Sequence, residues 1–197
     1  MIVGYNMNEK YYQEHFNEFI VDTSNANMKE LYNFFEKHIK KGMKILDVGF
    51  GSARDITHFS SKYDVYGIDV VDEFVNHAKK LCFNQVYKQS ILDITFQNTF
   101  DAIWACASLL HIEKENLNQA FKKCDKALKE DGVMYCSFKY GTFIGERNGR
   151  YYIDLTEESI KEYLKDTNFK IIDILVTIDV RPNRSEKWLN IILKKEN

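Results

Sequence analysis

Residues 44–55 read KILDVGFGSARD, and this stretch decides the fold. The apolar residues at its start alternate with polar ones and predict a strand over residues 44–48. Gly49 and Gly51 follow, where the chain must turn tightly and a ligand can approach the backbone. A helix is expected to begin directly after the turn. Strand, glycine turn and helix together predict a binding site for a nucleotide-like ligand.

The charged residues beside the turn favour one class of ligand over another. A dinucleotide fingerprint requires G-x-G-x-x-G/A, but its third small position falls at Arg54, which is bulky and charged. The carboxylate of Asp47 would repel a pyrophosphate, whereas it suits a ligand that carries an ammonium group. A nicotinamide-dependent oxidoreductase is therefore the weaker interpretation of this turn.

The pattern D-x-G-x-G-x-A over residues 47–53 resembles the first motif of class I S-adenosylmethionine-dependent methyltransferases. The resemblance extends over residues 43–197, where FDAIWACASLLHI, SFKYG, GRYY and DVRP…EKWLN are similar to a small bacterial subfamily often described as tellurite-resistance-like. Phe50 and Ala53 depart from it, since many members have cysteine and glycine there. The resemblance implies an enzyme that uses S-adenosylmethionine as cofactor and transfers a methyl group to a small-molecule acceptor by in-line displacement. The alternative is a non-catalytic module that binds S-adenosylmethionine.

Composition and charge narrow the range of partners. The 197 residues are 45% hydrophobic, which is enough for one domain, and we expect a helical cap over residues 1–42 and an α/β core over residues 43–197. A net charge of −2 leaves no basic excess for nucleic acid. The four cysteines show no zinc spacing, so no metal site is expected. We find no signal-peptide core and no apolar run of transmembrane length, which predicts a soluble cytoplasmic protein without membrane contact.

The order of the elements predicts an α/β fold. Strands are expected over residues 44–48, 64–69, 85–89, 100–107, 133–138, 169–179 and 187–194. Helices are expected over residues 26–40, 73–81, 113–128 and 156–165. This alternation favours a mostly parallel sheet with helices on both faces. The short loop before the last strand favours an antiparallel pair, which is typical of the Rossmann-like seven-stranded methyltransferase sheet.

Acidic residues at the strand ends are the main candidates for binding the cofactor. Asp69 ends the strand over residues 64–69, at the distance from the glycine turn where an acid holds a ribose; otherwise it caps the next helix. The resemblance implies that Asp93 accepts a hydrogen bond from adenine. The expected cofactor residues are Tyr12, Asp47, Gly49, Gly51, Asp69, Val70, Asp93, Ile94 and Ala105.

The segment after the strand over residues 100–107 carries the catalytic candidates, Ser108 and His111. Ligands sit beyond the carboxyl ends of parallel strands, so both side chains should lie near the methyl donor. His111 either deprotonates the acceptor or is a neutral wall residue that forms hydrogen bonds. A covalent nucleophile is not required, because the methyl donor is already activated.

Cations and phenols in two later segments are candidates for binding an anionic acceptor. They are Lys139, Tyr140, Arg150, Tyr152 and Arg181. Alternatively, Arg150 and Arg181 form structural ion pairs with Asp154 and Asp179. Asn148 and Gly149 also mark a tight turn, so part of residues 139–152 is a candidate hairpin. The oligomeric state and the identity of the acceptor are left open.

Overall fold

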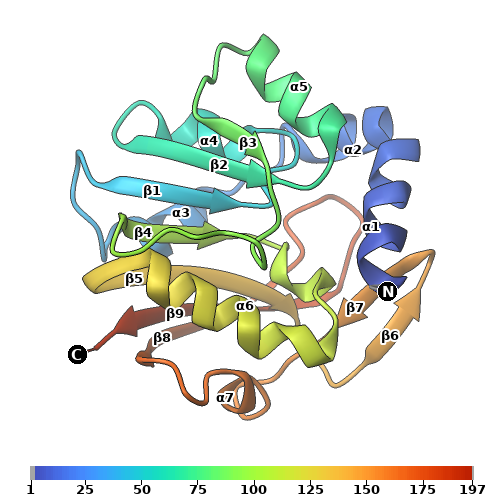
Figure 1. The fold of residues 1–197 in the computed structure, drawn as a ribbon. Coiled ribbons are helices and arrows are strands. Elements are labelled where there is room, and N and C mark those ends of the chain that lie inside the picture. Colours follow the sequence, from blue (N-terminus) through green and yellow to red (C-terminus); the bar gives the residue numbers. More distant parts are fainter. Residues whose placement is uncertain (1–2, 197) are drawn as a thin grey trace.

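The structure is a computed structural model that describes residues 3–196. Among these residues, the main sheet has seven strands. Their order is β3 (Val86–Lys88), β2 (Asp64–Asp69), β1 (Lys44–Val48), β4 (Phe100–Ala105), β5 (Leu128–Lys139), β9 (Lys187–Lys195) and β8 (Phe169–Ile178). Neighbouring strands pair in parallel except β9, which is antiparallel to both β5 and β8. The predicted seven-stranded sheet with an antiparallel last strand is confirmed (Figure 1).

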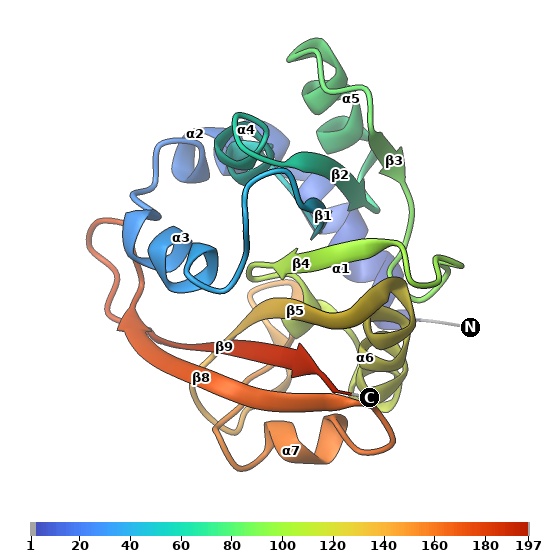
Figure 2. The same cartoon turned by 90° about the vertical axis from the view of Figure 1, so that its left-hand side faces the viewer.

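Helices cover both faces of this sheet. On one face α6 (Lys114–Ala127) and α7 (Ile160–Tyr163) pack against the core that contains Ile103 of β4. On the other face α3 (Lys29–Glu36) packs against the neighbouring residues of β4, Ala102 and Trp104, because successive strand residues point to opposite faces. Figure 2 shows α3 and α4 (Arg54–Phe59) on one side of the sheet and α6 on the other. Next to β3 lies α5 (Asp72–Lys80).

Several element ends differ from the prediction for local reasons. The strand β4 ends at Ala105 instead of residue 107, because Ala107 adopts a positive φ of 51° and turns the chain. Further along, β5 begins at Leu128, five residues early, and a register shift between Phe100 and Ala102 absorbs the extra residues. The helix predicted over residues 26–40 is shorter in the structure, where α3 spans Lys29–Glu36. Met28 flanks its start, and the chain after Glu36 forms tight turns.

The N-terminal helices α1 (Val3–Glu14) and α2 (Phe16–Thr23) lie across the carboxyl ends of the strands (Figure 1). His15 separates them with a non-helical φ of −109° and ψ of 23°, and its Nδ1 lies 2.8 Å from the carbonyl oxygen of Tyr11. The end of α2 is joined to the glycine turn, since the hydroxyls of Thr23 and Ser52 are 3.0 Å apart. Across residues 3–196, every helix is too short or too polar to span a membrane.

The predicted hairpin is present between β6 (Ile144–Arg147) and β7 (Arg150–Ile153). Asn148 and Gly149 form its turn with φ values of 54° and 73°, the left-handed conformation that a two-residue hairpin turn requires. The 3-10 helix η1 (Leu109–His111) follows β4 and lies against β7. The hairpin therefore reaches the strand ends that face α1.

A substitution at Gly49 tests how closely the glycine turn packs against Ser108. A Cβ at Gly49 would lie 2.5 Å from Cβ of Ser108, and its φ is +72°; Gly42 has a similar φ of +82° but nothing within 4 Å. Gly42→Ala should cost ~1–2 kcal/mol of unfolding free energy from its left-handed backbone. Gly49→Ala should cost a further ~1–3 kcal/mol from the clash. Urea denaturation measures both, and equal losses would contradict this close contact.

Candidate active site

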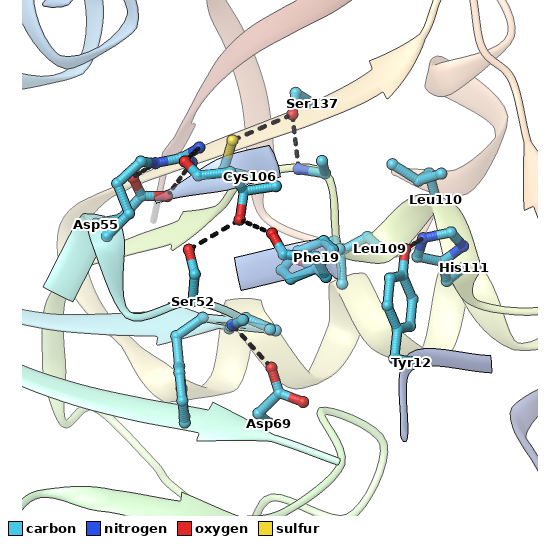
Figure 3. Close-up of a pocket in the computed structure, with 18 of the residues that line it drawn as sticks. Tyr12, Phe19, Ser52, Asp55, Asp69, Cys106, Leu109, Leu110, His111 and Ser137 are labelled. Atoms are coloured by element: carbon cyan, nitrogen blue, oxygen red, sulfur yellow. Dashed lines mark hydrogen bonds and ion pairs between the residues drawn. The ribbon is translucent and has the colours of Figure 1, made fainter. Parts of the chain in front are cut away.

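A cavity of about 590 Å³ lies at the carboxyl ends of β1, β2, β4 and β5. Helices α1 and α2 cover it, and β7 and the loop after β8 contribute further lining residues. Figure 3 shows its wall, with Asp69 near the glycine turn and with Tyr12 and His111 together at another part of the wall. This volume is within the range of small-molecule sites, which is about 300–1,000 Å³.

The cavity brings together most of the residues that the sequence singled out. Those that line it are Tyr12, Gly49, Gly51, Asp69, Val70, Ser108, His111, Lys139, Arg150, Tyr152 and Arg181. Five others, Asp47, Asp93, Ile94, Ala105 and Tyr140, are not among its lining residues in the described chain. Most of the residues expected to bind the acceptor and about half of those expected to bind the cofactor therefore line one cavity.

The residues outside the lining lie behind the wall or on the surface. Asp93 is exposed, and Gln89 and Ile91 line the cavity after β3 in its place. Tyr140 donates a hydrogen bond of 2.8 Å to Glu157 at the surface, so the structure does not support its expected contact with the acceptor. Gln89 directly follows the strand end beside Asp69, and this position is the signal that would have identified it.

The carboxylate of Asp69 joins two strand ends. Its Oδ2 accepts a hydrogen bond of 3.0 Å from the Gly51 N–H, which is the dashed line at Asp69 in Figure 3. Its Oδ1 accepts one of 2.9 Å from the Val71 N–H. Burial raises the pKa of Asp69 to about 6, although these backbone donors lower it. At neutral pH the carboxylate is ionised and still lines the cavity, where it can accept further hydrogen bonds.

Two polar atoms near the turn lack a hydrogen-bond partner among residues 3–196. One is Oγ of Ser108, which lies in the cavity wall beside Gly49. The other is Oδ2 of Asp47, directly behind the turn. Burial, together with the charges of Asp55 and Asp69, raises the pKa of Asp47 well above its usual value. Unpaired buried polar groups are costly, so this part of the wall suits a polar ligand.

Arg54 has a structural role that the sequence analysis missed. It donates two hydrogen bonds, of 2.7 and 2.8 Å, to the carboxylate of Asp55. Tyr32 Oη and Trp104 Nε1 donate to the same carboxylate over 2.6 and 2.9 Å. Burial raises the pKa of Asp55, but the Arg54 guanidinium outweighs this and holds it below its usual value. The pair ties α4 to α3 and β4, which fixes the helix after the turn.

His111 and Tyr12 form a hydrogen-bonded pair although they are far apart in the sequence. His111 Nδ1 lies 2.8 Å from the carbonyl oxygen of Tyr151, which can only accept, so Nδ1 carries the proton. Nε2 therefore accepts the 2.8 Å hydrogen bond from the Tyr12 hydroxyl (Figure 3). Burial lowers the pKa of His111 to about 4, and the cations of Arg150 and Lys139 add to this shift. The imidazole is neutral at physiological pH.

Arg150 is the cation nearest this pair. Its Nη1 donates to the Tyr12 oxygen over 3.3 Å, and the guanidinium lies 4.5 Å from the ring centre of Tyr11 and 5.2 Å from that of Tyr152. Within the described chain, no carboxylate lies within ion-pair distance of Arg150, and its buried Nε has no hydrogen-bond partner. Arg150 thus keeps a charge that a ligand can neutralise.

The other predicted cations are paired with acids. Arg181 contacts Asp179 over 2.6 and 2.9 Å, so the alternative of a structural ion pair holds for this residue. Asp154 pairs with Arg147 at 2.8 Å and not with Arg150. Lys139 lies 3.6 Å from Glu186. The two arginines that the sequence grouped together are therefore in different electrostatic environments.

Comparison with known proteins shows a similarity to methyltransferases over part of the chain. Residues 45–132 match a family described as a methyltransferase domain. Over 153 residues the chain is 27% identical to the phosphoethanolamine N-methyltransferase of Plasmodium falciparum (isolate 3D7). That alignment covers 72% of this chain and 53% of the relative, so the chain spans about half the relative's length. Residues 45–132 are therefore similar to a methyltransferase domain, in agreement with the resemblance seen in the sequence.

Solved structures share the fold at low sequence identity. The Burkholderia thailandensis 1,6-didemethyltoxoflavin-N1-methyltransferase, solved with 1,6-didemethyltoxoflavin and S-adenosylhomocysteine, superposes with a TM-score of 0.81 and 17% identity, covering 98% of this chain and 88% of that one. The [4+2]-cyclase SpnF superposes with a TM-score of 0.74 and 14% identity, covering 95% and 94%. These likenesses confirm the fold, and the cyclase illustrates that one fold can host different reactions.

The geometry around His111 predicts its titration. Its folded-state pKa of about 4 lies below the ordinary value of about 6.5, so the ring should stay neutral, with the proton on Nδ1, from pH 8 down to about pH 4. The same shift makes folding lose stability as the pH falls from about 6.5 to 4. Nitrogen-15 NMR of the imidazole measures the titration, and His111→Gln assigns the signal. A transition near pH 6.5 would contradict the buried pair.

Proposed function

We propose that this protein is an enzyme that transfers a methyl group from S-adenosylmethionine to a small acceptor with an anionic group. The observation that carries the proposal is one cavity whose wall holds the buried carboxylate of Asp69, the Tyr12–His111 pair and Arg150, which has no ion-pair partner in the described chain. A cofactor site and an acceptor site must adjoin in a methyltransferase. The methyltransferase domain match supports the same conclusion.

The residues around the glycine turn fit the cofactor. Asp69 would accept hydrogen bonds from the ribose hydroxyls, and the wall at Val70 and Gln89 would face the adenosine. The free Oγ of Ser108 beside Gly49 would contact a polar part of the ligand. When bound, S-adenosylmethionine supplies a methyl group on a sulfonium, and its sulfur keeps the bonding electrons when the methyl group leaves.

The chain's own residues position the acceptor and move its proton. The lone pair of the acceptor forms the new bond, so the acceptor loses a proton if it reacts through an O–H or N–H group. Tyr12 would take that proton while passing its own to Nε2 of His111, which lies 2.8 Å away. Because the pKa of His111 is about 4, the imidazole holds this proton only transiently. Correct positioning of the acceptor can lower the barrier by ~7–11 kcal/mol.

The charge of Arg150 supports an anionic acceptor. A carboxylate, phosphate or other oxyanion would give the guanidinium the partner that it lacks. The Plasmodium relative is named for phosphoethanolamine and the Burkholderia enzyme for a didemethyltoxoflavin, both small molecules. The tellurite-resistance-like resemblance and the cytoplasmic location remain predictions.

A turnover assay tests the proposal. The protein is incubated with S-adenosylmethionine and a panel of small amines, alcohols and thiols that carry an oxyanion, with phosphoethanolamine among them. We expect formation of S-adenosylhomocysteine that depends on one acceptor class. If the protein binds the cofactor tightly but converts none of the compounds in the panel and none of their uncharged counterparts, the non-catalytic module is favoured instead.

The state of Asp69 predicts how cofactor binding depends on pH. Only the ionised carboxylate accepts from both ribose hydroxyls, so protonation at a pKa of about 6 should weaken binding. The affinity for S-adenosylhomocysteine should fall by up to about tenfold per pH unit below pH 6. Asp69→Asn should bind more weakly, by ~1.5–3 kcal/mol, and without this pH dependence. Calorimetry at pH 5 to 8 measures the affinity for S-adenosylhomocysteine. If folded Asp69→Asn binds it as tightly as the unchanged protein, Asp69 has only a structural role.

The two arginines provide a matched pair of variants. Arg150→Ala should reduce acceptor turnover by ~10–100-fold through loss of a charge-assisted contact, with little change in melting temperature. Arg181→Ala leaves buried Asp179 without its guanidinium and should lower the unfolding free energy by ~1–3 kcal/mol. Turnover per folded molecule and thermal melts separate the effects. If Arg150→Ala mainly lowers the melting temperature, the acceptor site lies elsewhere.

A further inference from the structure

Asn8 lies in α1, one helical turn before Tyr12, and the residue is only 6% exposed. Its Oδ1 accepts a hydrogen bond of 2.8 Å from the Tyr151 N–H. Its Nδ2 donates to the carbonyl oxygens of His111 and Tyr151 over 3.1 and 3.5 Å. One buried amide thus contacts the backbone of η1 and of β7, both of which border the cavity.

We propose that Asn8 is a positioning residue that holds α1 against β7 and η1 and thereby fixes the ring orientation and tautomer of His111. The claim that Asn8 positions Tyr12, His111 and Arg150 depends only on the contacts in the structure. The claim that this positioning matters for catalysis rests on the proposed function. Asn8 was not among the residues that the sequence analysis selected.

The backbone of Tyr151 is the link between Asn8 and His111. Its N–H donates a hydrogen bond to Asn8, while its carbonyl oxygen accepts a hydrogen bond of 2.8 Å from the protonated Nδ1 of His111. The tautomer of a histidine is set by the hydrogen bond that its other nitrogen makes. A shift of the Tyr151 peptide would therefore release Nδ1 and remove the reason for Nε2 to remain an acceptor.

The same peptide orients the predicted acceptor residues. Side chains alternate along a strand, so Arg150 and Tyr152 share one face of β7 while Tyr151 points away from it. Both flanking residues line the cavity, and the Tyr151 hydroxyl instead accepts a hydrogen bond of 3.0 Å from the Lys114 N–H at the start of α6. Holding the Tyr151 backbone from the α1 side thus also aims Arg150 at the cavity.

The experiment compares Asn8→Ala with Asn17→Ala, a control on the exposed surface of α2. Nitrogen-15 NMR follows the His111 ring without cofactor or acceptor. The unchanged protein and Asn17→Ala should show one tautomer with the proton on Nδ1. Asn8→Ala should show a mixture that includes the Nε2-protonated form, with the pKa of His111 raised by ~1 unit or more toward its ordinary value. An unchanged His111 tautomer and titration in folded Asn8→Ala would overturn the proposal.

A second variant separates a specific role from general loosening of α1. Asn8→Asp keeps the oxygen that accepts from the Tyr151 N–H, and its second oxygen, which faces the carbonyl oxygens of His111 and Tyr151, would hold a proton and donate to one of them, so this variant should retain the Nδ1 tautomer. The role through Tyr151 would be contradicted if Asn8→Asp lost the Nδ1 tautomer as fully as Asn8→Ala does. It would also be contradicted if Asn17→Ala lost this tautomer. The tautomer readout needs no ligand. The positioning role can therefore hold even if S-adenosylmethionine fails to bind, in which case only the proposed function is wrong.

Discussion

One buried carboxylate joins the glycine turn to the end of the neighbouring strand, and the cavity depends on this interaction. Asp69 accepts hydrogen bonds from the N–H groups of Gly51 and Val71, which brings the loops after β1 and β2 together. On the other side of the turn, Gly49 lies against Ser108, where a Cβ would meet its neighbour at 2.5 Å. Three strand ends converge here, and only glycine leaves enough space between them.

The opposite part of the cavity is assembled from distant segments that carry complementary polar groups. Helix α1 contributes Asn8 and Tyr12, η1 contributes His111, and β7 contributes Arg150. The region around Asp69 is anionic, whereas the region around Arg150 is cationic with a neutral imidazole beside it. The cavity thus offers an anionic region and a cationic region to what binds there.

The sequence predicted the features of the fold that depend on local patterns of residues, but it did not predict contacts between segments that are distant in the chain. Alternating polarity and the glycine turn located β1 and β2 at their observed bounds and the site at the strand ends. The resemblance pointed to Asp93 for the adenine, but Asp93 is exposed, and Gln89, four positions earlier in the chain, lines the cavity. Tyr12 and His111 are separated by 99 residues, and no local pattern records that α1 folds back over η1.

Calorimetric titration with S-adenosylhomocysteine and, in parallel, with a nicotinamide dinucleotide tests the central claim most directly. The fold alone does not decide it, since a cyclase shares the same architecture. We expect micromolar or tighter binding of S-adenosylhomocysteine, because Asp69 offers an acceptor for ribose hydroxyls and Ser108 a polar wall, while the carboxylate of Asp47 behind the glycine turn would repel a pyrophosphate. Clear heat with the dinucleotide and none with S-adenosylhomocysteine would contradict it.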